Sequence, residues 1–113
     1  MEKQRDINSY FEGILENINI ILDNSFYSND DKKNLEYVKL EVETWYISYK
    51  EKNTLKCIQP NKLKNIGIEI TDFFDKYVMT EPVKENYAER LSYDFGYLEK
   101  NWKVEMLGGK KNG

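Results

Sequence analysis

Apolar residues recur along the chain at alternating steps of three and four, and polar or charged residues fill the positions between them. Because an α-helix has 3.6 residues per turn, this spacing gathers the apolar side chains on one helical face. We therefore predict an all-α fold, an antiparallel helical bundle of about four helices that bury these faces against one another. The predicted core positions, in four groups, are Ile7, Tyr10, Phe11, Ile14, Ile18, Ile21 and Leu22; Leu35, Val38, Val42, Trp45 and Tyr49; Leu63, Ile66, Ile70, Phe73 and Tyr77; and Val83, Tyr87, Leu91, Phe95, Leu98 and Trp102.

Residues that favour helix ends lie next to these groups. Ser28 precedes the second group and is followed by acidic residues, as at a helix N-cap and first turn. Pro60 suits the first turn of the third helix. Thr80 is the expected N-cap of the fourth helix, with Pro82 in its first turn.

Two segments leave alternatives open. Residues 37–58 alternate in part at a period of two, so a β-hairpin there would give an α+β fold. Glu and Lys fill the intervening positions of this stretch up to Tyr49, which favours the helix. Gly67 costs about 1 kcal/mol inside a helix. The third segment is therefore expected either as a kinked helix or as two shorter pieces.

Length and composition fit one compact unit. The 113 residues are 33% charged, and 17 basic against 20 acidic residues give a net charge of −3. We expect a single helical domain over 1–107 and a flexible C-terminal tail over 108–113, which begins at paired glycines. No stretch approaches the ~20 apolar residues of a membrane-spanning helix. The first residues lack the pattern of a signal peptide, and a single cysteine excludes an intramolecular disulfide, so we expect a cytoplasmic protein.

The usual catalytic and metal-binding residues are scarce. There is no histidine, which removes the commonest general base and metal ligand, and one cysteine cannot build a zinc site. Glu69, Asp72 and Asp75 would form an acidic ridge on a helix, but they are interpreted as a solvated face. Cys57 has no base near it in the sequence and is expected to be a small buried or half-buried hydrophobe. We expect neither a cofactor nor enzymatic activity.

Residues 62–78 resemble the turn and second helix of a helix-turn-helix DNA reader over about fifteen residues, around Ile66 and Gly67. A recognition helix needs donors for bases and positive charge for phosphates. This segment would instead present Asp72 and Asp75 against a single Lys76. We do not expect direct nucleic-acid binding, although a small nucleic-acid-binding regulator remains an alternative function.

Several apolar and aromatic residues lie off the predicted core faces. At 100° per residue, Leu40 and Ile47 lie almost opposite the core face of their helix, seven positions apart. Tyr93 and Tyr97 lie off the face of the fourth helix, and Arg90 lies one turn before Tyr93. Tyr and Arg are enriched at interface hot spots, so we predict these five residues as partner contacts. A homodimer would use them equally well.

The N-terminal part of the chain is acidic. Residues 1–30 have six acidic and two basic residues, a net charge of −4 against −3 for the whole chain. We predict that Glu12 and Glu16 steer association with a basic protein partner, for example one with a nucleic-acid-binding groove.

The predicted function is that of a non-enzymatic, protein-binding inhibitor or antagonist that occludes a macromolecular partner. The abundance of Asn, Lys, Ile and Tyr suggests an AT-rich coding sequence, as in bacterial mobile elements. In size and composition the chain is similar to anti-CRISPR proteins and toxin-immunity proteins, without a shared motif. The alternatives are the nucleic-acid-binding regulator and a helical scaffold or oligomerising protein of a phage or plasmid.

Overall fold

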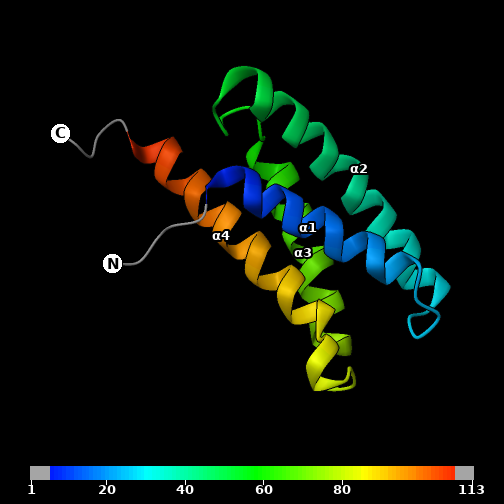
Figure 1. Ribbon diagram of the computed structural model, residues 1–113. Helices are drawn as coiled ribbons and strands as arrows, with labels where there is room; N and C mark the ends of the chain where they lie inside the picture. Colours follow the sequence, from blue (N-terminus) through cyan, green and yellow to red (C-terminus); the bar gives the residue numbers. More distant parts are fainter. Residues whose placement is uncertain (1–5, 109–113) are drawn as a thin grey trace.

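The computed structural model describes residues 6–108, which form four α-helices and one short 3₁₀ helix (Figure 1). The elements are α1 (Ile7–Leu22), α2 (Asn29–Lys52), α3 (Pro60–Tyr77), η1 (Val83–Glu85) and α4 (Tyr87–Gly108). No strand occurs in this part of the chain, so the all-α prediction is confirmed. The alternative β-hairpin over 37–58 is wrong, because α2 continues without interruption to Lys52.

The helices pack as a bundle in which each helix contacts two others. Helix α1 packs against α2 and α4, and α3 packs against the same two helices from the other side. Consecutive helices run in roughly opposite directions, as predicted for short connections (Figure 1). Among residues 6–108, no helix combines the length and the apolar character that crossing a membrane would need. Residues 109–113 of the predicted tail lie outside the described part of the chain, and Gly108 is the last residue of α4.

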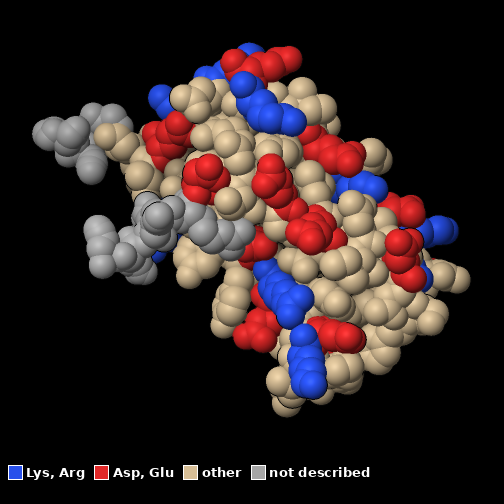
Figure 2. Space-filling model, in the orientation of Figure 1, with Lys and Arg blue, Asp and Glu red and all other residues tan. Residues whose placement is uncertain are grey.

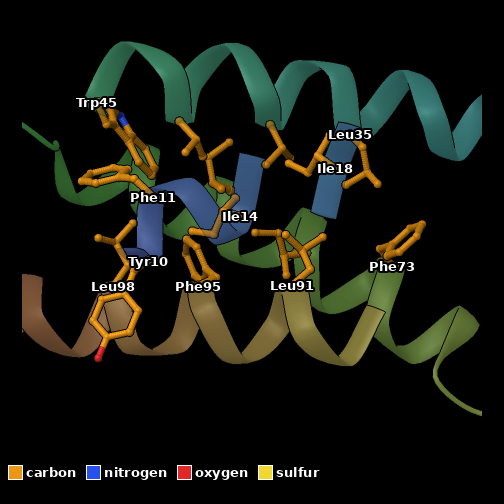
Figure 3. Packing of buried hydrophobic residues seen from close by; sticks show 14 of the residues in the cluster. Tyr10, Phe11, Ile14, Ile18, Leu35, Trp45, Phe73, Leu91, Phe95 and Leu98 are labelled. Atoms are coloured by element: carbon orange, nitrogen blue, oxygen red, sulfur yellow. The ribbon is translucent and has the colours of Figure 1, made fainter. Parts of the chain in front are cut away.

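The core consists largely of the residues selected by the helical spacing. Side chains from α1, α2 and α4 point into a common interior, which α3 closes from behind (Figure 3). Burial of these apolar side chains is the main favourable term for the fold. The side chains that are completely or almost completely buried include Phe11, Ile14, Ile18, Ile21, Leu35, Val38, Ile66, Ile70, Leu91 and Leu98.

Helix α3 is continuous through Gly67, so of the two alternatives the one with two shorter pieces is wrong. The ring of Phe95 on α4 packs at this position, where an added Cβ would lie only 3.2 Å from the Phe95 Cε2 atom. The glycine therefore lets an aromatic ring approach the α3 backbone, and this packing offsets its helix-propensity cost. The turn implied by the helix-turn-helix resemblance is absent from this segment.

Helix α4 begins at Tyr87 and not near Thr80. The Thr80 hydroxyl donates to the Tyr77 carbonyl oxygen (3.1 Å) and so completes the end of α3. The N-terminus of α4 is capped by Asn86, whose side-chain oxygen accepts from the Glu89 backbone N–H (2.9 Å). Val83, predicted as a core residue of α4, lies in η1 before the helix and is 92% exposed.

Tyr27 anchors the connection between α1 and α2. Its buried ring packs against Phe73 and Tyr77 of α3, with ring centroids 5.5 and 4.9 Å away. The next residue, Ser28, is the predicted N-cap of α2, and its side chain accepts from the Asp31 backbone N–H (3.2 Å). The α1–α2 connection is thus ordered by packing on α3.

The connection between α2 and α3 is held by the C-terminal half of α4. The backbone N–H of Leu55 donates to Glu105 (2.5 Å), and the Trp102 indole donates to the Ile58 carbonyl oxygen (3.0 Å). Leu55 and Ile58 are both buried. Because these contacts join residues more than 40 positions apart, α4 links the connection between α2 and α3 to the rest of the bundle.

Asp31 joins α2 to α3 by accepting several hydrogen bonds. Its Oδ2 atom receives the Tyr77 hydroxyl (2.5 Å), the Ser28 hydroxyl (2.7 Å) and the Lys76 ammonium (2.8 Å). Burial raises the pKa of Asp31, but the hydrogen bonds from Lys76, Tyr77 and Ser28 outweigh burial and hold the pKa below the ordinary value of 3.8.

This lowered pKa predicts a pH-dependent contribution to stability. The unfolded chain takes up the Asp31 proton at a higher pH than the folded chain, so the contribution is complete above the ordinary pKa and is lost as pH falls through the folded pKa. We expect Asp31→Asn to destabilise the protein at about pH 6 and to cost progressively less as pH falls from about 4 to about 2.5. Urea unfolding at a series of pH values measures the difference. A difference that stays constant with pH would contradict this assignment.

Candidate protein-binding surface

A shallow groove of about 450 Å³ lies where α1 and α4 pack side by side. Four of the residues predicted as partner contacts line it. These are Arg90, Tyr93 and Tyr97 from α4, and Glu16 from α1. These residues were predicted from two separate helices, and the packing of α1 on α4 brings them together. The complete lining is Gly13, Glu16, Asn17, Ile20, Arg90, Tyr93, Asp94 and Tyr97.

The two tyrosines on α4 differ in how firmly they are held. Tyr97 is 49% exposed, and its ring stacks on the buried ring of Tyr10, with centroids 5.4 Å apart and planes 15° from parallel. Tyr93 is 61% exposed. The carboxylate of Glu89, one turn earlier, accepts a hydrogen bond from Tyr93 and raises its pKa above the ordinary value of 10. This hydrogen bond holds the Tyr93 hydroxyl toward Glu89.

Arg90 is held in place at the mouth of the groove. Its guanidinium lies over the Tyr87 ring, 5.1 Å from the centroid, and one nitrogen donates to the Lys84 carbonyl oxygen (3.1 Å). Arginine has five N–H donors, so most of them stay available to a partner in a fixed orientation. Arg90 also ties η1 to α4, which gives it a structural role that the sequence did not indicate.

The outer face of α1 beside the groove is acidic. Glu12, Glu16 and Asp23 are exposed along it, at helical spacing. Figure 2 shows acidic side chains gathered where α1 crosses the molecule, with basic side chains below them toward the start of α4. Glu12 also accepts a hydrogen bond from the Tyr46 hydroxyl (2.8 Å), so it links α1 to α2 as well as contributing charge. Burial, and then this bond, raise the pKa of Tyr46 to about 12.

Sequence reasoning missed the polar floor of the groove. Asn17 is buried, and its side chain donates to the Gly13 carbonyl oxygen one turn earlier (2.9 Å). Asp94 on the facing side of α4 is also buried. Asn17 sits directly beside Ile18 in the core pattern, and Asp94 sits directly beside Phe95. In the sequence each of these two residues is marked only as a polar residue next to a core position, because neither helix specifies which helix it faces.

Leu40 and Ile47 do not line this groove. They are 65% and 57% exposed on the outer side of α2, away from its packed face against α1 and α3. The seven predicted contact residues therefore divide into two sets: the α1–α4 groove with its acidic border, and the outside of α2.

The acidic ridge and the single cysteine singled out in the sequence lie in the described part of the chain. No group of three or more Cys, Asp or Glu side chains between residues 6 and 108 is arranged to hold a metal ion, and this includes the ridge of Glu69, Asp72 and Asp75. The Cys57 thiol is half-buried and lies 3.8 Å from the Thr54 carbonyl oxygen, to which it donates.

Fold and surface together define a small four-helix bundle with an exposed, tyrosine-containing groove on one side. No protein-family model, curated protein or solved structure matches this chain.

Proposed function

We propose that this protein is a non-enzymatic, cytoplasmic inhibitor that binds and occludes a protein partner through the α1–α4 groove. The observation that supports the proposal most is the convergence of Arg90, Tyr93 and Tyr97 with Glu16 on one concave surface. Tyr and Arg dominate hot spots in protein interfaces, and a concave surface allows them to be desolvated together. The sequence has no histidine, which is the commonest general acid–base residue.

Pre-organisation supports the same proposal. Association costs roughly 0.5–1.5 kcal/mol for each flexible side chain that becomes fixed. Tyr97 is already stacked on Tyr10, and Arg90 is already positioned by Tyr87 and Lys84. Much of that ordering is therefore complete before a partner arrives, which favours tight binding over transient contact.

The charge around the groove favours a basic partner. Glu16 lines the groove, and Glu12 and Asp23 extend an acidic border from it along the outer surface of α1. A Lys- and Arg-rich protein surface, such as one that itself binds nucleic acid, would be attracted to this border and would associate faster at low salt. A nucleic-acid phosphate backbone would be repelled by it. An inhibitor from a mobile element that blocks a nucleic-acid-binding protein has this combination of properties.

Truncating Tyr93 tests the proposal. We expect Tyr93→Ala to weaken binding to the partner by about 30-fold or more, because a hot-spot tyrosine contributes about 2 kcal/mol or more. The stability of the bundle should change by less than about 0.5 kcal/mol, since the side chain is mostly exposed. The measurement is calorimetric titration of the chain with a partner captured from its host by the wild-type protein.

Two further variants complete the test. Glu16→Lys should reduce the association rate, and should do so less at high salt. Val83→Ala, exposed and outside the groove, is the matched control and should bind as the wild type does. Full-strength binding by Tyr93→Ala would exclude the groove as the site. Binding of the purified chain to duplex DNA with a steep salt dependence would favour the nucleic-acid regulator instead.

A further inference from the structure

The outside of α2 has a second, fully exposed stripe that the bundle does not use. Lys33, Tyr37, Leu40, Thr44, Ile47 and Glu51 recur at alternating steps of four and three and are all exposed. We call these residues the α2 stripe. This spacing is the 3.5-residue repeat of a coiled-coil seam, in which Tyr37, Thr44 and Glu51 take one core position and Lys33, Leu40 and Ile47 take the other. The core-facing residues of α2 occupy the opposite side of the helix.

The polar residues of the α2 stripe leave its central part apolar. The Thr44 hydroxyl donates to the Leu40 carbonyl oxygen (3.0 Å), so its hydrogen bond is made within the helix and its methyl group remains for packing. Tyr37, Leu40 and Ile47 are large apolar side chains with 41%, 65% and 57% of their surface exposed. The charged members lie only at the two ends, where a coiled-coil seam meets solvent.

The stripe is symmetric about Val42. A second copy of α2 laid antiparallel across that point would place Leu40 against Thr44, and Tyr37 against Ile47. At the ends it would place Lys33 of each copy against Glu51 of the other. Each contact joins the two different core positions of the repeat, which is the pairing that antiparallel coiled coils make. A two-fold axis repeats every contact, as a closed dimer requires.

Charge complementarity indicates that the molecule that packs on the α2 stripe is a second copy of this chain. Lys33 and Glu51 are on the same helix but about 27 Å apart, so they cannot meet within one molecule. Neither forms an ion pair in the part of the chain that the structure describes. Beside the seam, Glu36 of one copy would lie near Lys50 of the other. The antiparallel arrangement therefore pairs opposite charges at both ends, whereas a parallel one would pair Lys33 with Lys33.

We propose that the α2 stripe is a self-association surface that forms an antiparallel homodimer with its two-fold axis at Val42. The surface is separate from the α1–α4 groove, so dimerisation leaves both grooves open and the inference does not depend on the proposed function. Glu43 of the two copies would approach each other near the axis and oppose association. With few apolar layers, we expect a dissociation constant of about 1–100 µM, typical of a small interface.

Charge reversal tests the arrangement. Sedimentation of the full chain from about 1 to 500 µM measures the dissociation constant. Lys33→Glu alone converts both end pairs to like charges and should weaken the dimer by about tenfold. The double variant Lys33→Glu/Glu51→Lys restores opposite charges in an antiparallel dimer and should recover the wild-type constant. A double variant as weak as the single one would overturn the antiparallel arrangement.

Two further variants are expected to change the dissociation constant of the dimer in opposite directions. Glu43→Gln removes the repulsion at the axis and should tighten the dimer while the helical circular dichroism stays unchanged. Ile47→Asp should abolish association while the helical circular dichroism stays unchanged, and the groove variant Tyr93→Ala is the matched control that should still dimerise. A chain that is monomeric at about 500 µM, or one whose association survives Ile47→Asp but is lost in Tyr93→Ala, would overturn the proposal.

Discussion

Replacing Phe11 with alanine is expected to lower the free energy of unfolding by about 3–5 kcal/mol. Phe11 is a completely buried core residue of α1. Its ring stacks on Tyr46 and lies against Tyr49, with centroids 4.8 and 5.7 Å away. Truncation removes a large apolar contact and leaves a cavity that α1 and α2 cannot close without moving. Urea unfolding followed by circular dichroism measures the change.

Two further variants accompany Phe11→Ala: a smaller change at the same position, and a control outside the core. Phe11→Leu keeps most of the apolar volume and should cost about 1–2 kcal/mol. Val83→Ala removes a side chain that the sequence placed in the core but that is almost fully exposed, and it should change stability by less than about 0.5 kcal/mol. If Phe11→Ala costs no more than Val83→Ala, the core assignment of α1 is wrong.

The core was predictable because burial follows a local period. Positions such as Phe11, Val38 and Ile66 were selected only by their spacing along one helical face, and each is completely buried. A helix of 3.6 residues per turn must turn those positions to the same side, whatever it packs against. The same rule favoured a helix over a hairpin in residues 37–58, because the spacing from Leu35 to Tyr49 is regular, and α2 indeed runs to Lys52.

The residues of the candidate site were predictable one by one, but their grouping was not. Tyr93 and Tyr97 lie off the core face of α4, and that alone marked them as exposed. Their proximity to Glu16 depends on how α1 crosses α4, which no spacing within either helix specifies. For the same reason the sequence could not separate Leu40 and Ile47, on the outside of α2, from the residues of the groove.

The start of α4 was mispredicted because long-range contacts determine it. Thr80 and Pro82 have the local character of a helix start. However, Glu81 between them is buried, and its carboxyl group makes contacts 54 residues back along the chain and seven residues forward. With Glu81 fixed in the interior, the backbone first forms the exposed turn η1 and enters the helix only at Tyr87.

Replacing Glu81 with alanine is therefore expected to cost about 3 kcal/mol, because it leaves two buried donors without an acceptor. One carboxyl oxygen accepts the Tyr27 hydroxyl, and the other accepts the Ala88 backbone N–H in the first turn of α4 (3.0 Å). Burial, and then the bond to Glu81, raise the pKa of Tyr27 well above its ordinary value of 10, so the tyrosine remains a donor at every working pH. Differential scanning calorimetry should give a thermal midpoint lower by about 10 °C or more.

A double-mutant cycle separates the two bonds. Tyr27→Phe removes one hydroxyl and should cost about 1–2 kcal/mol, while Glu81→Gln keeps an acceptor for the Ala88 N–H and should cost less than Glu81→Ala. If Tyr27 and Glu81 act as a pair, the double variant Tyr27→Phe/Glu81→Ala should be more stable than the sum of the two single changes implies, by about 1 kcal/mol. Strict additivity would mean that the two side chains do not interact. It would also remove the reason given for the late start of α4, because Glu81 would then not hold the α1–α2 connection and the N-terminus of α4 together.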